Sequence, residues 1–428
     1  MRIRSWTALV VTAAALAVPA CSTGTSTSTG TADDPGVLQT SELPDGVELV
    51  TAEVPRSAPG DPSLAGAAMT TFGVDLWQRL PADGNLAISP YSIYAVLAMA
   101  RAGATGATAT ELDTVLGAQS GSTTTTVDAA LRAAVEAPDN PDDSRSLTVE
   151  TANSLWAQRG LDLLAPFVST MGSDFGAGVR LTDYAADPEA SRAAINSWVA
   201  ELTRDLVPEL CPPGSIDAGT LLTLVNAVYF AANWDPPFVL STQLLTFTAP
   251  TGTLQVPAFG GVVSVPTAEG PGWQSATIPY VGGGAAMTLI VPDAGRFDDV
   301  QRALGPDLLA AAQGGTASEV WLTVPTFEVD ASISLTEPLQ HMAPSMFDDG
   351  FTAMASDATL LTSQVIHQAV VSVDEKGTVA AAATAMMLAG GAPTEPRKFT
   401  VDRPFLFVIA DTQTGAPLFV GRVTNPAE

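Results

Sequence analysis

The stretch VDEKGTVAAAATAMMLAGGAPTEPRKFTVDRPF, residues 373–405, decides how the rest of the chain is interpreted. It contains Glu375-Lys376-Gly377-Thr378, followed by seven small residues, Val379 to Ala385. The four consecutive alanines favour a helix, but side chains this small also suit a strand that must enter a narrow space. A segment that suits two conformations is what a conformational switch requires.

Three motifs in the C-terminal part of the chain resemble those of one family. They are Glu375-Lys376-Gly377-Thr378 with its alanine run, Phe399-x-x-Asp402-Arg403-Pro404-Phe405, and Leu418-Phe419-x-Gly421-Arg422-Val423-x-Asn425-Pro426. Together they resemble the hinge, reactive loop and C-terminal signature of serpins, the serine protease inhibitors. The resemblance continues in order from Ala67 to Pro426, and no internal repeat or second-domain boundary competes with it.

The resemblance implies an α/β fold of the mixed, multi-domain-like serpin type. Its expected features are three β-sheets, about nine helices and an exposed reactive loop, all within residues 63–428. The apolar run from Leu222 to Ala231 suits a central strand that is buried on both faces.

The hinge can also be argued from strand geometry, in which alternate residues face the same side. Thr378, Ala380, Ala382 and Thr384 would face the buried side of a sheet, and none of them is charged or large. Insertion therefore need not bury an unpaired charge, which favours an inhibitor. Val379 stands where many serpins have Glu, but it would face outward and should be tolerated. The hinge comprises Glu375, Gly377, Thr378, Val379, Ala380, Ala381, Ala382, Ala383 and Thr384.

The position of the bond that a target protease would cleave is implied by the family's spacing from Glu375. That spacing places the bond between Gly391 and Ala392. Met387 and Leu388 are stronger anchors for a protease pocket, so Met387–Leu388 and Leu388–Ala389 remain alternatives. Because no Lys or Arg lies near these bonds, we expect chymotrypsin-, subtilisin- or elastase-like targets rather than trypsin-like ones.

Four polar residues from distant parts of the chain, Ser89, Ser92, Asn226 and His367, are each set in apolar sequence. The resemblance places them beneath the centre of the main sheet, where its strands part. A buried polar group costs roughly 1–3 kcal/mol unless it is partnered, so we expect a hydrogen-bonded cluster. A Ser89–His367 catalytic dyad is the alternative, although no third group or oxyanion donor pair is visible.

Trp234 also corresponds to a family position, near the point where the hinge enters the sheet. An ordinary core tryptophan is the simpler interpretation, and the two are compatible.

The N-terminus has the pattern of a secretion signal, which we assign to residues 1–20. Val18-Pro19-Ala20-Cys21 resembles the lipobox of bacterial lipoproteins, with Cys21 as the lipid attachment site. A plain cleaved signal is the alternative. Residues 21–62 are rich in Ser, Thr, Gly and Pro and are expected to form a tether. The sequence therefore predicts a secreted protein that is extracellular or lipid-anchored at the cell membrane.

The formal net charge of −27 makes nucleic acid and anionic membrane surfaces poor partners. Known nucleophile, phosphate-binding and zinc motifs are absent from the sequence. The two histidines, His341 and His367, lack the further ligands of a zinc site, so no metal or cofactor is expected. Cys211 is expected to be a buried structural thiol.

These observations favour a monomeric inhibitor of serine-type endopeptidases rather than an enzyme. It would act as a suicide substrate, through cleavage of its reactive loop and insertion of the loop into the main sheet. A non-inhibitory binding protein with the serpin fold is the alternative.

Overall fold

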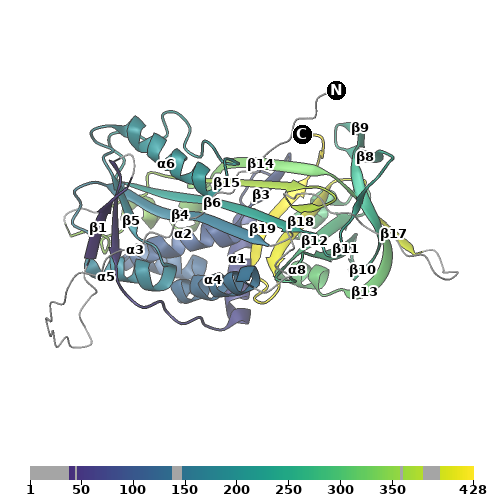
Figure 1. The fold of residues 1–428 in the computed structure, drawn as a ribbon, viewed down its shortest axis with the longest axis horizontal. Coiled ribbons are helices and arrows are strands. Elements are labelled where there is room, and N and C mark those ends of the chain that lie inside the picture. The colour runs from purple at the N-terminus through teal and green to yellow at the C-terminus, as the bar shows by residue number, and fades with distance from the viewer. Residues whose placement is uncertain (1–37, 44–45, 137–146, 357–359, 379–395) are drawn as a thin grey trace, which may run out of the picture. The chain divides into compact units, whose positions relative to one another are not determined.

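The computed structural model describes residues 38–43, 46–136, 147–356, 360–378 and 396–428. The chain divides into two units, Met1–Pro35 and Gly36–Glu428, and all the described residues belong to the second. Within these ranges the chain forms three β-sheets, ten α-helices and one π-helical turn (Figure 1). The prediction of a mixed α/β fold with three sheets and about nine helices is confirmed.

The main sheet has eight strands and contains the buried strand expected at residues 222–231. In order across the sheet, its strands are β1 (Leu38–Glu42), β2 (Glu48–Ala52), β5 (Val179–Thr182), β4 (Thr148–Gln158), β6 (Leu222–Asn233), β16 (Gly377–Thr378), β15 (Gln364–Val373) and β14 (Phe327–Ser334). Every residue of β6 is buried, because helices cover both faces of this part of the sheet.

The two faces of the main sheet pack against different helices (Figure 1). On one face, α6 (Pro188–Leu202) places Ile195 and Val199 against Trp156 and Val225. On the other, α2 (Pro90–Ala102) contacts both β4 and β6. Pro90 occupies the first turn of α2, and the Ser89 hydroxyl accepts a hydrogen bond from the Ser92 backbone N–H, which caps the helix.

Nine further helical segments complete the described part of the chain. They are α1 (Pro62–Trp77), α3 (Gly106–Leu116), α4 (Ser120–Glu136), α5 (Ala165–Thr170), the π-helix η2 (Met171–Phe175), α7 (Phe297–Arg302), α8 (Pro306–Gln313), α9 (Thr336–Met342) and α10 (Ser345–Asp348).

A second sheet of nine strands packs beside the main one. Its order is β17 (Arg397–Thr400), β13 (Thr316–Pro325), β10 (Ala258–Gly270), β11 (Trp273–Pro279), β12 (Ala285–Pro292), β18 (Phe405–Asp411), β19 (Pro417–Val423) and β3 (Leu86–Ile88), with β7 (Val239–Leu240) paired to β10. The third sheet is the hairpin of β8 (Leu245–Ala249) and β9 (Gly252–Val256).

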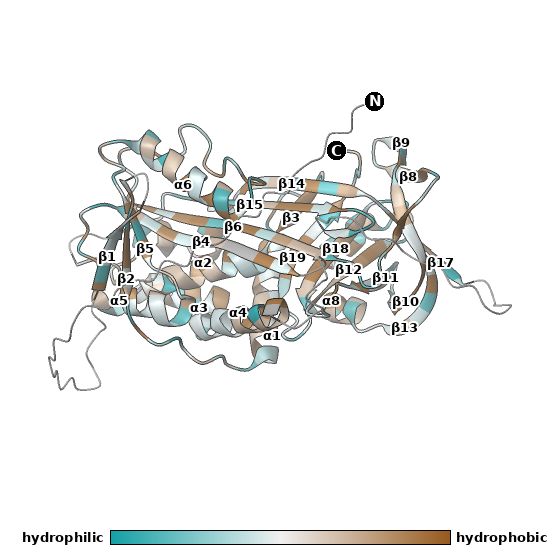
Figure 2. Cartoon of the chain, viewed as in Figure 1, coloured by the Kyte–Doolittle hydropathy of each residue, from teal (hydrophilic) through white to brown (hydrophobic). Residues whose placement is uncertain are grey.

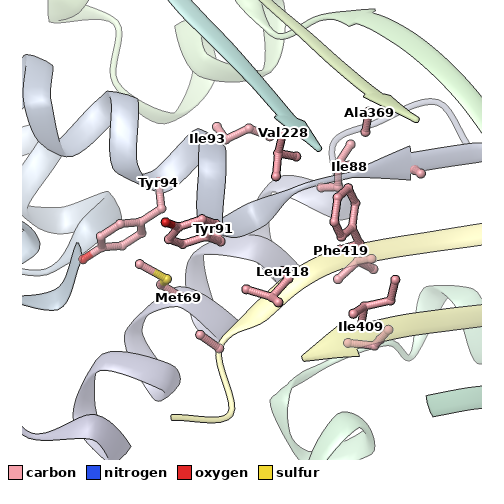
Figure 3. Packing of buried hydrophobic residues seen from close by; sticks show 14 of the residues in the cluster. Met69, Ile88, Tyr91, Ile93, Tyr94, Val228, Ala369, Ile409, Leu418 and Phe419 are labelled. Carbon is pink, nitrogen blue, oxygen red and sulfur yellow. The ribbon is translucent and has the colours of Figure 1, made fainter. Parts of the chain in front are cut away.

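One continuous core joins the sheets to the helices. Ile93 of α2 and Val228 of β6 lie close to Ile88 of β3 and Phe419 of β19 (Figure 3). Apolar residues concentrate along the inner strands, whereas polar residues mark the outer strands and the helix surfaces (Figure 2).

Part of the segment expected to be a tether is folded. β1 and β2 form an antiparallel hairpin, and β2 pairs with β5 to extend the main sheet. Val47 and Val50 are buried, and the Glu48 carboxylate forms an ion pair with Arg159, whose Nε lies 2.8 Å from Glu48 Oε1. The expectation of a tether to residue 62 therefore differs from the structure over 38–52, because distant residues supply the contacts that order this stretch.

Candidate functional site

The central strands of the main sheet separate part-way along their length. β6 and β15 run parallel and pair directly from Thr223–Gln364 to Val228–Ala369. Beyond Ala369, the described pairings between them stop, although both strands continue. Residues 229–231 of β6 and 370–372 of β15 thus face a gap in the hydrogen-bonding ladder.

The start of the hinge occupies the far end of this gap. Thr378 of β16 pairs with Ala232 of β6 on one side and with Val373 of β15 on the other, antiparallel to both. Its side chain is 1% exposed, and its hydroxyl lies 2.8 Å from the Tyr280 hydroxyl. Thr378 therefore points to the buried side of the sheet, the side that strand alternation predicts for it. The remaining hinge residues, 379–384, lie outside the described residues.

A tight turn joins β15 to β16 and places Thr378 between β15 and β6. The Asp374 carboxylate accepts hydrogen bonds from the Lys376 and Gly377 backbone N–H groups at 2.8 and 3.2 Å. Gly377 approaches β6 so closely that a Cβ atom would lie 2.0 Å from the Ala232 carbonyl oxygen. Only glycine fits at this position. Glu375 lies in the same turn, and its carbonyl oxygen accepts from the Phe238 backbone N–H.

Trp234 donates two hydrogen bonds to the turn between β15 and β16. Its indole Nε1–H donates to the Asp374 carbonyl oxygen at 2.8 Å, and its backbone N–H donates to the Lys376 carbonyl oxygen at 2.9 Å. The ring is fully buried and stacks on Tyr280, with centroids 4.6 Å apart. The two interpretations of Trp234 coincide, since it is a core residue and also contacts the hinge turn.

The four polar residues singled out in the sequence meet beneath the paired half of β6 and β15. Asn226 donates through Nδ2 to the Ser92 hydroxyl at 2.7 Å, and its Oδ1 contacts His367 Nδ1. His367 Nε2 accepts from the Ser89 backbone N–H at 3.0 Å. All four residues are fully buried. The contacts join α2, β6 and β15, and lie just before the point where the two strands separate.

Burial sets the protonation state of His367. Desolvation lowers the pKa of the imidazole to about 3, so the ring is neutral at pH 7. Nε2 is an acceptor for the Ser89 N–H, so the remaining ring proton is on Nδ1 and is donated to Asn226. Both ring nitrogens are therefore engaged away from the Ser89 hydroxyl, which instead accepts the capping bond of α2. This geometry does not form a catalytic dyad.

Asn153 belongs to the same polar cluster and was not singled out in the sequence. Its Oδ1 accepts from the Ser92 hydroxyl at 2.7 Å and from Asn226 Nδ2 at 2.9 Å. Asn153 lies on β4 directly opposite Asn226. The signal that could have indicated Asn153 is its position opposite Asn226 on the neighbouring strand. This position follows only from the register between β4 and β6, which the sequence does not give.

Comparisons with known proteins agree with this geometry. The family model described as "Serpin (serine protease inhibitor)" matches residues 67–426. The chain belongs to the serpin family. An uncharacterized serpin-like protein of Thermococcus kodakarensis is 33% identical over 374 residues, covering 84% of this chain and 85% of that protein.

Two further relatives show that the serpin fold serves different tasks. The leukocyte elastase inhibitor of Bos taurus is 30% identical, covering 84% of this serpin and 99% of that protein. Human thyroxine-binding globulin, solved in complex with thyroxine, has a TM-score of 0.75 and 25% identity, covering 86% of this serpin and 100% of that chain. The fold is thus shared by an inhibitor and by a thyroxine-binding protein.

The other residues predicted to matter are those of the candidate scissile bonds and the two cysteines. The candidate bonds at Met387–Leu388, Leu388–Ala389 and Gly391–Ala392 lie outside the described residues, as does Cys21. Cys211 is a free, buried thiol, as expected, and burial raises its pKa to about 11. In the described part of the chain, no helix is long and apolar enough to cross a membrane.

The depressed pKa of His367 predicts a pH-dependent stability. Unfolded histidine titrates near 6.5, whereas folded His367 titrates near 3. As the pH falls, the unfolded state therefore binds a proton at this histidine at a higher pH than the folded state does. The contribution of neutral His367 to the unfolding free energy is complete above pH 6.5 and is lost as the pH falls toward 3. Between pH 7 and 5, wild type should lose about 2 kcal/mol more unfolding free energy than His367→Gln.

Urea denaturation at the two pH values measures this difference. His341→Gln, which changes the other and exposed histidine, is the matched control and should follow wild type. Equal losses in wild type and His367→Gln would show that His367 is not buried in its neutral form.

Proposed function

We propose that this serpin inhibits serine-type endopeptidases as a suicide substrate. The observation that carries the proposal is the position of β16, whose two residues lie between β6 and β15 at the end of a stretch where, among the described residues, these two strands have no pairing with each other. A strand that continued from Thr378 would enter this stretch. Addition of such a strand to a sheet is supported by new backbone hydrogen bonds on both sides.

The chemistry begins in the target protease. Its serine hydroxyl attacks the carbonyl carbon before the scissile bond, and the bond to the next nitrogen breaks. The amine leaves with a proton as a new N-terminus, and the serpin remains attached to the protease as an ester. We place this bond at Gly391–Ala392, with Met387–Leu388 and Leu388–Ala389 as alternatives.

Cleavage frees the hinge from its attachment to β17. The hinge then inserts beyond Thr378 between β6 and β15, carrying the acylated protease with it. Insertion must separate the Asn226–His367 contact and the pairing from Thr223 to Val228, and the new strand replaces these contacts. Inhibition succeeds only if insertion is faster than hydrolysis of the ester. The small inward-facing residues of the hinge therefore matter because they allow fast insertion.

Chymotrypsin-, subtilisin- and elastase-like enzymes are the proposed targets, because the candidate bonds lack a neighbouring basic residue. We further propose that the protein is monomeric and secreted, with residues 1–20 as its signal. Lipid attachment at Cys21 would tether it to the cell surface.

A protease panel tests the inhibitory proposal. The serpin is mixed with subtilisin, chymotrypsin and elastase and separated on SDS gels, where a band at the summed mass is expected. The same proteases, blocked beforehand at their serine, should give no such band. Mass spectrometry of the released C-terminal peptide identifies the cleaved bond.

A binding function is the second candidate, and it is favoured by the similarity to thyroxine-binding globulin. Cleavage by every protease of the panel without any covalent complex would support this alternative and contradict inhibition.

A further inference from the structure

A cavity of about 490 Å³ lies where the main sheet has a gap near its β1 edge. β4 begins at Thr148, but its pairing with β5 begins only at Leu155, so no described strand flanks the first half of β4 on this side. The cavity is lined by Leu49, Tyr91, Ala95, Met99, Arg180 and Trp198, among others. Its volume is within the range that holds a small organic ligand.

The walls come from residues inside and outside the region matched by the serpin family model. Ala95 and Met99 come from α2, and Trp198 comes from α6 on the opposite face of the sheet. Leu49 belongs to β2, which precedes the region matched by the serpin family model. The N-terminal hairpin therefore completes a cavity that the rest of the fold would leave open.

Arg180 gives the cavity a cationic wall. Its guanidinium lies 4.2 Å from the centroid of the Trp198 ring, and its Nη1 donates to the Ser154 hydroxyl at 2.9 Å. Its Nε–H has no hydrogen-bond partner, and no described carboxylate forms an ion pair with it. Burial lowers the pKa of Arg180 to about 10, yet the group stays protonated at pH 7. In a chain of net charge −27, few cations would be expected to lack a described carboxylate as partner.

The cavity is also lined by Asp128, whose carboxyl group accepts a hydrogen bond from the Tyr91 hydroxyl at 2.7 Å. Burial raises the pKa of Asp128 and so favours its neutral form, while Tyr91, Arg132 and Arg56 oppose this shift. An anionic ligand would therefore be drawn to Arg180, with its apolar part against Ala95, Met99 and Leu49. A carboxylate matches the planar guanidinium and can accept two hydrogen bonds from it.

We propose that this cavity binds a small carboxylate with a short apolar body, held by Arg180. The site is separate from the hinge, but it touches the polar cluster. Asn153 lines the cavity, and its Oδ1 accepts from both Ser92 and Asn226. An occupant therefore lies against a residue that is bonded across the centre of the main sheet.

Decanoate is a suitable probe, used below its micellar concentration, with decanol and decyltrimethylammonium as matched ligands of different charge. Calorimetric titration of the full chain should show binding of decanoate and at least tenfold weaker binding of the other two. At a hundredfold excess over Kd, decanoate should raise Tm by roughly 3 to 5 °C.

Three variants locate the site. Arg180→Gln should weaken decanoate binding at least tenfold, whereas Arg302→Gln, at an exposed arginine of α7, should bind like wild type. Ala95→Leu fills the cavity without changing its charge and should also weaken binding. It keeps the test decisive if Arg180→Gln folds poorly.

Fluorescence reports the position of the ligand independently of affinity. A brominated carboxylic acid of the same length should quench the tryptophan emission of wild type, and most of this quenching should disappear in Trp198→Phe. The proposal is overturned if decanoate does not bind, if decanol binds equally well, or if Arg180→Gln and Ala95→Leu both bind like wild type. None of these outcomes depends on protease inhibition.

Discussion

Thr378→Arg is expected to leave the serpin cleavable by its target protease but unable to form an SDS-stable complex with it. Thr378 is 1% exposed and packs between β6 and β15, with its hydroxyl against that of Tyr280. An arginine there would have to bury an unpaired charge, which costs several kcal/mol. The hinge would then stay out of the gap, and the ester would hydrolyse.

The matched control is Val379→Arg, one residue further along. Strand alternation turns position 379 toward solvent once the hinge is inserted, so this arginine remains hydrated and the complex should still form. Gel analysis and the number of serpin molecules consumed per protease molecule measure both variants. Complex formation by Thr378→Arg at the wild-type level would refute insertion as the mechanism.

Cleavage of the reactive loop is expected to raise the melting temperature of wild type by more than about 15 °C. A strand inserted between β6 and β15 forms ladders on both sides, whereas now the two strands pair directly only up to Val228 and Ala369. At about 0.5–1.5 kcal/mol net for each hydrogen bond, some ten new bonds contribute roughly 10 kcal/mol. Burial of the small hinge side chains adds to this gain.

Calorimetry of intact and cleaved protein measures the shift, after the protease has been inactivated. Cleaved Thr378→Arg is the control, since it carries the same break and should melt close to its intact form. An unchanged melting temperature in cleaved wild type, or continued digestion of the severed hinge by added protease, would favour the binding protein over the inhibitor.

Much of this protein was predictable from local patterns. The motifs around Glu375, Asp402 and Gly421 indicated the family, and the apolar run from Leu222 indicated the buried central strand that became β6. The polar residues Asn226 and His367 stood out because each interrupts an apolar run. These signals are local because burial, strand alternation and turn chemistry act on neighbouring residues.

The features that escaped prediction depend on long-range contacts. β1 and β2 lie in a polar, weakly patterned segment, and β2 is ordered by β5 and by the close approach of Val50 to Gly178. The place of Asn153 in the polar cluster depends on the register between β4 and β6. That Arg180 forms no ion pair with a described carboxylate has no local signature either, because its neighbours come from several distant parts of the chain.

The sequence by itself determined the small, uncharged side chains on the inward-facing positions of the expected hinge, and on these the proposed insertion depends. Only the tertiary structure decided where that strand can form. The gap exists because β6 and β15, brought together from distant parts of the chain, pair over half their length and then separate around Thr378. The size of a side chain is a property of each residue, whereas the separation of two strands arises only when both are packed in the folded protein.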